Sequence, residues 1–380
     1  MARCNGWILP ILVMASMGAG GAAAAADLPA STQAFLKQLN LPAGTMDGLD
    51  RELAVPQAWL DGARKNPVVK ISGIEEPQLQ AQMIKPFLER YPFMKVDFQR
   101  GSANERVVRP LLAFREGRYL MDVVQSMNSS MGEFIKLDAA ADLTDLPTFD
   151  SVLPGAHDAR GVAIGFRAKA HCMSYNTDLI KKEQLPKTWA EFPESPLLRD
   201  GRVGAVMLPH LWFMPLWGKF GEARATQYLD DFFVKLKPQI RREGLNAAMG
   251  LVAAGENYVS IPAYAERIKE LRDKGAPIAF YCPDMVPMEM PKVAIFRGTP
   301  GINGAKLYVN WLISKEGQIA QMAVLSSQSV HKDLQSAKFV VFPEEIEGKD
   351  VISFDDQPTT DRFIEMWNKY ALSGSRPNAQ

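Results

Sequence analysis

Short apolar runs alternate with helical stripes through the first half of the chain. Three runs of strand type stand at residues 68–73, 94–98 and 119–124. Between the first two runs, apolar residues recur every four positions and so share one face of a helix, at Leu79, Met83, Phe87 and Tyr91. Pro86 interrupts this stripe and predicts a kink. Strands that alternate with helices through short links predict a parallel sheet with helices on its faces.

The second half repeats this alternation after a strand-like segment at residues 162–166. In that segment Val162, Ile164 and Phe166 alternate with smaller or polar residues. Further strand-like runs follow at 203–207, 259–261 and 277–282, with helical stripes at 223–236 and 245–254. Because residues 162–166 lie between two α/β blocks, they predict a crossing segment from one lobe to the other, and residues 293–296 are the predicted return. Helices at 304–315 and 318–325 should then pack on the first block.

Polar residues at the ends of these segments mark helix caps and ligand-facing loops. Asn176 or Thr177 is expected to cap a helix after the crossing segment, and Thr188 to cap a second one. Open α/β sheets hold ligands in the loops at the carboxyl ends of their strands. Those loops contain four candidate ligand-binding residues, Ser72, Gly73, Gln125 and Ser126.

Length and composition favour a soluble two-domain protein. The chain has 380 residues, of which 47% are hydrophobic and 23% charged, and its formal net charge is zero. A nucleic-acid groove would need a basic excess, so small solutes are the expected partners and nucleic acid is not. Residues 1–26 combine Arg3, a short apolar run and small residues up to Ala26, which predicts a secretory signal cleaved near Ala26. The apolar run is shorter than the roughly 20 residues of a membrane anchor.

Cysteine usage and the absence of catalytic motifs further restrict the class of protein that the sequence predicts. Cys172 and Cys282 would remain after export; two buried apolar thiols are favoured over a disulfide, since the residues are far apart in sequence. Cys4 precedes the apolar run, so it is not placed for lipidation. The sequence contains no G-x-S-x-G, H-E-x-x-H or C-x-x-C motif. It therefore predicts a binding protein rather than an enzyme, with no cofactor and no metal.

Several short stretches, taken in order, carry a resemblance to a known family. They are PQAW at 56–59, FLERYP at 87–92, DVV at 122–124, SYN at 174–176, LPKTW at 185–189, Gly255-Glu256, VAI at 293–295 and NWLISKEGQ at 310–318. In this order, and behind a signal peptide, the chain resembles the extracellular solute-binding proteins of ABC importers. The resemblance spans roughly residues 56–325. It is to the two-lobed group with two crossing strands that includes the ferric-binding proteins.

The resemblance implies an architecture and a role. The expected fold is α/β: a type II, two-lobed periplasmic-binding-protein fold with mostly parallel sheets flanked by helices and two crossing strands as hinge. After an N-terminal extension at 27–55, lobe 1 would comprise residues 56–166 and 290–380, and lobe 2 residues 167–289. A periplasmic monomer would capture a solute between the lobes and deliver it to an inner-membrane ABC permease. A ferric-ion or anion-binding protein, or a receptor presenting its ligand to a membrane sensor, would share this fold.

The chain departs from the ferric pattern and points to an organic ligand instead. Ferric members of the family hold iron with two adjacent tyrosines, whereas the matching stretch here, IPAYAER at 261–267, has Tyr264 alone between alanines. The stretches LPHLWFMPLW at 208–217 and MVPMEM at 285–290 suit an adaptable apolar wall, or else plain core packing. The predicted ligand is an organic molecule with a large apolar part and a small polar head.

The further candidate contacts fall into two groups. The polar candidates are Tyr175, His210, Tyr264 and Arg267, in addition to the loop residues above; the apolar candidates are Trp212, Met214, Met285 and Met288. The polar candidates could also have purely structural roles. Tyr175 could pack in the core at the hinge, and His210 could simply open a helix after Pro209. Arg267 stands in a charged helix, where a surface ion pair is favoured over a ligand contact.

Overall fold

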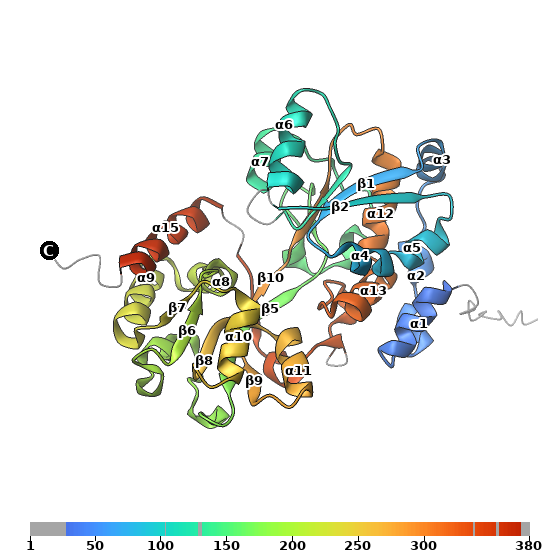
Figure 1. Cartoon of the computed structure of the whole chain (residues 1–380). Helices are drawn as coiled ribbons and strands as arrows, with labels where there is room; N and C mark the ends of the chain where they lie inside the picture. The colour runs from blue at the N-terminus through green and yellow to red at the C-terminus, as the bar shows by residue number, and fades with distance from the viewer. Residues whose placement is uncertain (1–27, 103, 128–130, 337–338, 355–356, 374–380) are drawn as a thin grey trace, which may run out of the picture.

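The computed structural model describes residues 28–102, 104–127, 131–336, 339–354 and 357–373. Its elements gather into two lobes, each built on its own sheet (Figure 1). In the first sheet the strand order is β2-β1-β3-β11-β4. The strands are β1 (Val68–Gly73), β2 (Lys95–Arg100), β3 (Val123–Gln125), β4 (Ile164–Gly165) and β11 (Lys292–Ile295). The predicted strands of the first half therefore form one sheet, whose core includes the fully buried Val69, Ile71 and Val123.

The helical stripe after β1 is present but divided at the proline. Helix α4 (Pro77–Met83) ends just before α5 (Lys85–Arg90), which carries Pro86 in its first turn. Proline lacks an N–H donor and fits best in the first turn of a helix, and the chain begins a new helix there. Between β2 and β3 the chain forms η3 (Asn104–Val108) and α6 (Arg109–Arg115), and α7 (Met131–Lys136) follows β3. The predicted kink is thus a break between two short helices.

The second sheet has the order β12-β10-β5-β8-β6-β7, with β9 also paired to β5. Its strands are β5 (Lys169–Asn176), β6 (Val203–Val206), β7 (Gln239–Arg241), β8 (Val259–Tyr264), β9 (Ile278–Tyr281), β10 (Met285–Glu289) and β12 (Asp350–Ile352). Four of its helices are α8 (His210–Phe220), α9 (Glu222–Asp231), α10 (Leu245–Ala253) and α11 (Ala265–Asp273). Strand β5 runs antiparallel to β8, β9 and β10, and β11 runs antiparallel to β3 and β4. Both sheets are therefore mixed rather than mostly parallel, because the crossing and returning strands run against the others.

Two extended segments join the lobes where the sequence pattern places them. The chain leaves the first sheet after β4, enters the second at β5, and returns between β10 and β11. The backbone N–H of Phe166 donates to the carbonyl of Pro291 over 3.1 Å, so the two crossings are hydrogen-bonded to each other. The next helices, α12 (Ile302–Ile313) and α13 (Lys315–Leu325), belong to the first lobe, as expected.

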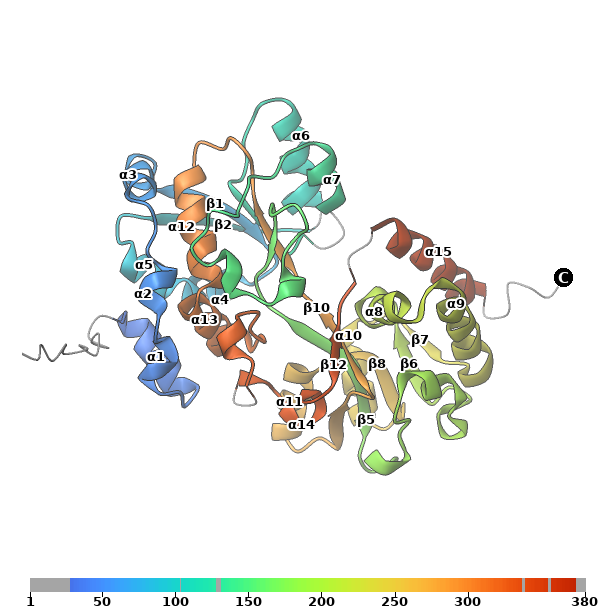
Figure 2. The ribbon, with the colours of Figure 1, turned by 180° about the vertical axis from the view of Figure 1, so that it is seen from behind.

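A third passage between the lobes corrects the expectation that all of residues 290–380 belong to lobe 1. After α13 the chain returns to the second lobe, where β12 pairs in parallel with β10. Helices α14 (Pro343–Ile346) and α15 (Gln357–Ser373) lie with that lobe in Figure 2. The physical reason is apolar burial: Phe363 and Trp367 of α15 are almost fully buried and pack on Phe213 and Phe232.

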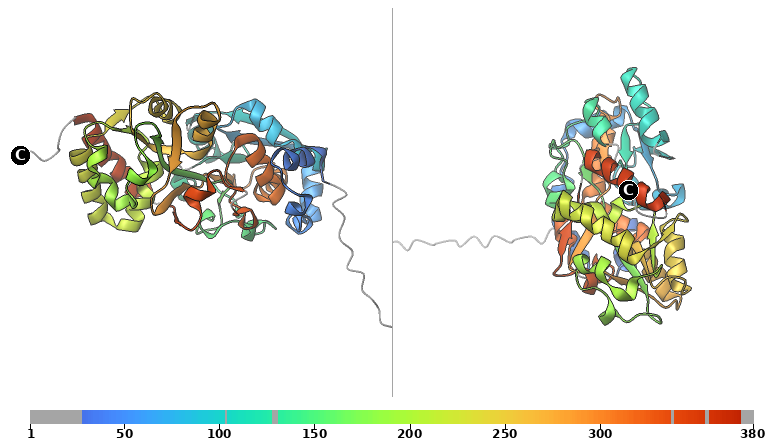
Figure 3. Two further views of the ribbon diagram at one scale, coloured as in Figure 1. Left: turned by 90° about the horizontal axis from the view of Figure 1, so that it is seen from below. Right: turned by 90° about the vertical axis from the view of Figure 1, so that its left-hand side faces the viewer.

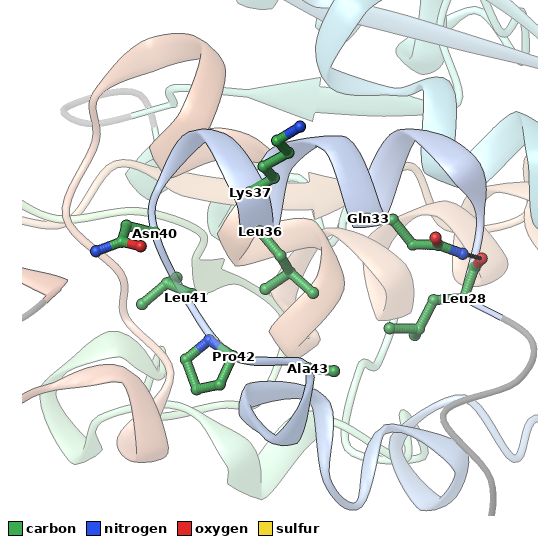
Figure 4. Close-up of a pocket in the computed structure, with 8 residues that line it drawn as sticks. All are labelled: Leu28, Gln33, Leu36, Lys37, Asn40, Leu41, Pro42 and Ala43. Carbon is green, nitrogen blue, oxygen red and sulfur yellow. Dashed lines mark hydrogen bonds between the residues drawn. The ribbon is translucent and has the colours of Figure 1, made fainter.

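The N-terminal extension packs on the first lobe at the end remote from α15, as Figure 3 shows. Helix α1 (Ala30–Gln38) is followed by η2 (Ala43–Met46) and α2 (Leu49–Glu52), and α3 (Gln57–Lys65) precedes β1. Thr32 donates to Oε1 of the fully buried Glu316 over 2.6 Å, and the Arg90 guanidinium lies 2.5 Å from Oε2 of the same residue. A cavity of about 660 Å³ lies along α1 and the turn after it (Figure 4). This cavity is remote from the crossing strands.

The segment after β5 confirms one predicted cap and corrects the other. Thr188 accepts the N–H of Glu191 and starts the 3-10 helix η8 (Trp189–Glu194), as expected. Asn176 accepts the N–H groups of Asp178 and Leu179, but a turn follows, not a helix. No helix of the described segments combines the length and the apolarity that a bilayer span requires. The predicted signal segment, residues 1–26, lies outside the described residues.

Cys172 and Cys282 form a disulfide, so the expectation of two free thiols is wrong. Strands β5 and β9 are antiparallel neighbours with Met173 opposite Tyr281. The same register brings the two cysteines to a Cα–Cα distance of 5.1 Å despite their separation of 110 residues in sequence. Strand pairing over such a separation leaves no local pattern in the sequence.

Candidate functional site

Three basic side chains lie close together where the chain enters the second lobe. Lys169 and His171 stand two residues apart on β5, so the alternation of a strand puts them on one side. Arg167 precedes β5 by two residues, and its charge acts on Lys169. Arg167 is 3% exposed and His171 is 2% exposed. Charged groups are seldom this buried unless they are paired, so their partners decide what the site can do.

Arg167 ties the crossing segment to the first lobe. Its Nη1 lies 2.6 Å from Oε1 of Glu75, and both side chains are only 4% exposed. Its Nη2 donates to Oγ of Ser126 over 3.3 Å. Glu75 follows β1 and Ser126 follows β3, so the two partners come from the carboxyl ends of lobe 1 strands. Arg106 supports them, because its Nη1 donates to the carbonyls of Gln125 and Ser126 over 2.8 and 2.7 Å.

His171 and Lys169 lie against second-lobe partners. Nε2 of His171 is 3.1 Å from Oε2 of Glu289, which stands on β10 directly opposite Lys169. Tyr264, at the end of β8, stands directly opposite His171. The Lys169 ammonium lies 5.6 Å from the centre of the Tyr264 ring, within cation–π range.

Two further groups complete this arrangement. Glu266 stands in the first turn of α11, just after Tyr264, and His210 begins α8. Burial raises the pKa of Glu266, while the charges of Lys169 and His171 partly oppose that rise. Burial lowers the pKa of His210.

The same surroundings shift the pKa values of Lys169 and Glu289. Burial lowers the pKa of Lys169, and the charge of Arg167 lowers it further. Burial by itself would raise the pKa of Glu289, but the hydrogen bond and charge of His171, with the charges of Lys169 and His210, outweigh burial and lower it.

We call this set the hinge-face group: Glu75, Arg167, Lys169, His171, His210, Tyr264, Glu266 and Glu289. Its members come from both lobes and carry both signs of charge, so the group suits a polar, charged solute rather than an oily one. Within the described ranges, no three His, Cys, Asp or Glu side chains converge in the way a metal ion needs. Sequence reasoning named only Tyr264 and His210 of this group. The missed signal was the alternation of Arg167, Lys169 and His171 with alanine and cysteine.

The predicted first-lobe residues do gather beside this group. Gln125 donates from Nε2 to the Tyr308 hydroxyl over 2.8 Å, and Ser126 takes a left-handed backbone conformation with φ of 56°. Ser72 donates to the Arg106 carbonyl over 3.3 Å and lines a cavity of about 290 Å³ together with Arg100, Arg106 and Arg109. Gly73 has no room for a side chain, because an added Cβ would lie 2.7 Å from Phe98.

The predicted apolar residues lie elsewhere. Trp212 is 1% exposed and stacks on Trp189 at a ring distance of 5.7 Å, and Met214 is 2% exposed. Met285 and Met288 are also buried, on β10. These positions correct the expectation of an apolar wall facing the ligand, because the side chains belong to the core of the second lobe. The alternative of plain core packing describes them.

Two of the predicted polar contacts also stand apart from the group. Tyr175 lies toward the far end of β5, opposite Val259 and Ala279, and burial raises its pKa. Arg267 lies on α11 with its Nη1 2.5 Å from Oε2 of Glu270, which is the surface ion pair favoured by the sequence. Neither residue makes a contact with the hinge-face group among the described interactions.

Known proteins resemble the chain both in sequence and in fold. The family model of bacterial extracellular solute-binding proteins matches residues 82–347. An uncharacterized protein of Haemophilus influenzae is 27% identical over 157 residues, which are 38% of this chain and 42% of the relative. The matched stretch thus spans less than half the length of that curated relative.

Solved structures share the fold. Iron-bound HitA from Pseudomonas aeruginosa has a TM-score of 0.62 at 18% identity, over 81% of this chain and 99% of HitA. An extracellular solute-binding protein from Bordetella parapertussis has a TM-score of 0.66 at 14% identity, over 82% and 100% of the chains. AfuA from Actinobacillus pleuropneumoniae, with bound fructose-6-phosphate, has a TM-score of 0.58 at 17% identity, over 80% and 98%. These likenesses confirm the two-lobed fold that the sequence resemblance implies.

Proposed function

The chain belongs to the family of bacterial extracellular solute-binding proteins, and from this premise we propose that it captures a small, charged organic solute at the hinge-face group. The family and the structural neighbours are binding proteins rather than enzymes, so no catalytic residue is assigned. The protein works outside the cytoplasm and hands its solute to a membrane permease of the ABC type.

One observation carries this proposal. Side chains of both signs converge where the chain crosses between lobes, and Arg167 connects them to Glu75 and Ser126 of the first lobe. A solute that reaches from the second-lobe members of this group to Glu75 or Ser126 contacts both lobes at once. It therefore binds the closed arrangement more tightly than the open one, which is the condition for a ligand to drive closure.

The ligand chemistry differs from the oily molecule that the sequence suggests. Trp212 and Met214 lie in the core, so they offer no apolar surface to a solute. The hinge-face group at the crossing consists of charged or hydrogen-bonding side chains. A ferric ion is the less favoured alternative, because Tyr264 stands without a second tyrosine beside it and its hydroxyl interacts with Asn246.

Thermal-shift titration followed by calorimetry tests the proposal. Charged organic solutes, including amino acids, dicarboxylates, diamines and sugar phosphates, are compared with ferric citrate and with terpenoid or steroid lipids. We expect at least one charged solute to raise the melting temperature, and His171→Gln to weaken that effect. The control Lys187→Gln, at an exposed position, should leave it unchanged. Stabilisation by ferric citrate alone or by lipids alone would refute the proposal.

Native mass spectrometry of protein purified from its own envelope gives an independent reading. A small charged molecule carried by the protein supports the proposal, whereas a carried lipid contradicts it. A partner that is a sensor instead of a permease would leave both experiments unchanged. Co-purification with permease and ATPase subunits separates those two roles.

A further inference from the structure

Two opposite charges in the hinge-face group have no ion-pair partner among the described residues. Glu75 pairs with Arg167, and Glu289 pairs with His171. Lys169 has no carboxylate at ion-pair distance among the described residues, although the charges of Glu266, Glu289 and Glu75 act on it, and its ammonium lies over the Tyr264 ring. Glu266 has no Lys, Arg or His at ion-pair distance, although it feels the charges of Lys169 and His171. Among the described residues, the group thus contains one cation and one anion that are not held in an ion pair.

These two charges lie near each other, beside Tyr264. Tyr264 ends β8, Glu266 follows it in the first turn of α11, and Lys169 lies over the Tyr264 ring from β5. The two charges act on each other but do not touch, since no ion pair joins them. Both are half-buried, and a charge away from water without an ion-pair partner is costly. A ligand that supplies both missing partners would remove that cost.

We propose that the solute is zwitterionic, with its acidic group on Lys169 and its ammonium group on Glu266. This inference rests on the proposed function and names its substrate class. A dianion would place its second acidic group against Glu266, and a diamine would place an ammonium against Lys169, so each carries a repulsive contact.

Matched probes on the unaltered protein test the charge requirement directly. The zwitterionic set is the twenty common amino acids with 4-aminobutanoate, 5-aminopentanoate and 6-aminohexanoate. For each zwitterion that raises the melting temperature, calorimetry compares it with the deaminated acid and the decarboxylated amine. We expect both analogues to bind roughly 10- to 100-fold more weakly, which corresponds to one lost charged hydrogen bond. Equal affinity of a zwitterion and either analogue overturns the inference.

Variants assign the two ends of the ligand. Lys169→Gln should weaken the zwitterion and leave the weak binding of its decarboxylated amine unchanged. Glu266→Gln should weaken the zwitterion and leave that of the deaminated acid unchanged. A purely structural role for either residue would weaken both probes alike. Lys269→Gln and Glu270→Gln, exposed on the same helix α11, are the matched controls and should change nothing.

The outcomes separate this inference from the proposed function. Binding of dicarboxylates, diamines or sugar phosphates without any zwitterion overturns the inference, while the role as a receptor for charged solutes stands. Binding of lipid or ferric citrate alone overturns both. The probe comparison needs no variant, so it remains decisive even where Glu266→Gln fails to fold.

Discussion

At the residue scale, the buried Arg167–Glu75 pair is the clearest determinant of stability near the crossing. Both side chains are 4% exposed and their charged atoms lie 2.6 Å apart. Breaking one partner of a buried pair leaves an uncompensated charge, which costs about 3–5 kcal/mol. We expect Glu75→Gln to lower the free energy of unfolding by that amount in urea titrations.

The neighbouring residue supplies the control for this prediction. Glu76 pairs with Arg100 at an exposed position, where the side chains are 58% and 53% exposed. Glu76→Gln should cost under about 1 kcal/mol, as exposed pairs do. The double variant Glu75→Leu, Arg167→Met should recover part of the lost free energy of unfolding, because it leaves no buried charge without a partner. Equal losses of unfolding free energy in Glu75→Gln and Glu76→Gln would contradict the expectation that Glu75→Gln leaves a buried charge without its partner.

The pKa of Glu289 predicts how stability changes in acid. Burial would raise this pKa, but His171, Lys169 and His210 together bring it below the ordinary 4.5. A carboxyl whose folded pKa is lowered stabilises the fold fully above its unfolded value, and the contribution is lost as pH falls through the folded pKa. Wild type should therefore lose more stability than Glu289→Gln as the pH falls below about 4.5. Urea titrations from pH 3 to 6 measure this; parallel curves would contradict it.

At the element scale, the disulfide cross-links β5 to the chain just after β9, within the second lobe's sheet. Cys172 and Cys282 are 110 residues apart, so the cross-link removes much freedom from the unfolded chain. We expect the double variant Cys172→Ala, Cys282→Ala to lose about 2–5 kcal/mol of unfolding free energy. Reducing agent should destabilise wild type similarly and leave the double variant unchanged. A response of the double variant to reductant would contradict this assignment.

Helix α15 provides a second prediction at this scale. Trp367 is 1% exposed and packs on Phe232 and Phe233, and Leu372 of the same helix is 65% exposed. Trp367→Ala should cost about 3–5 kcal/mol, whereas Leu372→Ala should stay within about 0.5 kcal/mol. Urea unfolding monitored by circular dichroism measures both. Equal effects would mean that α15 contributes no packing to the second lobe.

The elements also mark where sequence reasoning succeeds and fails. Strands such as β1 and the cap at Thr188 were predicted because their signals are local: apolar alternation, and a hydroxyl three residues before Glu191. The disulfide and β12 were not, because both depend on strand pairing over long separations. Local hydropathy could not distinguish an apolar ligand wall from core packing, so Trp212 was misplaced. Lys169 and His171 of β5 carry no sequence signal of a site individually, because only the strand places them on one face.

At the scale of the whole molecule, three passages join the lobes, and any closure must bend all of them. Strands β5 and β10 pass side by side, and the segment before β12 is the third connection (Figures 1 and 2). Arg167 lies at the first passage and holds Glu75 of lobe 1. Motion of the lobes is therefore expected as rotation about these passages, with α15 carried along by the second lobe.

Distance measurements test this motion. In Figure 2, α7 of the first lobe and α15 of the second lie on facing sides of the molecule. Dyes on Lys136→Cys and Arg362→Cys, in a chain prepared from residue 27 onward, should approach each other when a solute identified by calorimetry is added. The native cysteines are joined in the disulfide and do not take the dyes. A pair within the second lobe, Lys187→Cys and Arg362→Cys, should report no change. Binding heat without any change in the inter-lobe distance would mean that the solute is held without closure, and that the charges at the hinge do not act through both lobes.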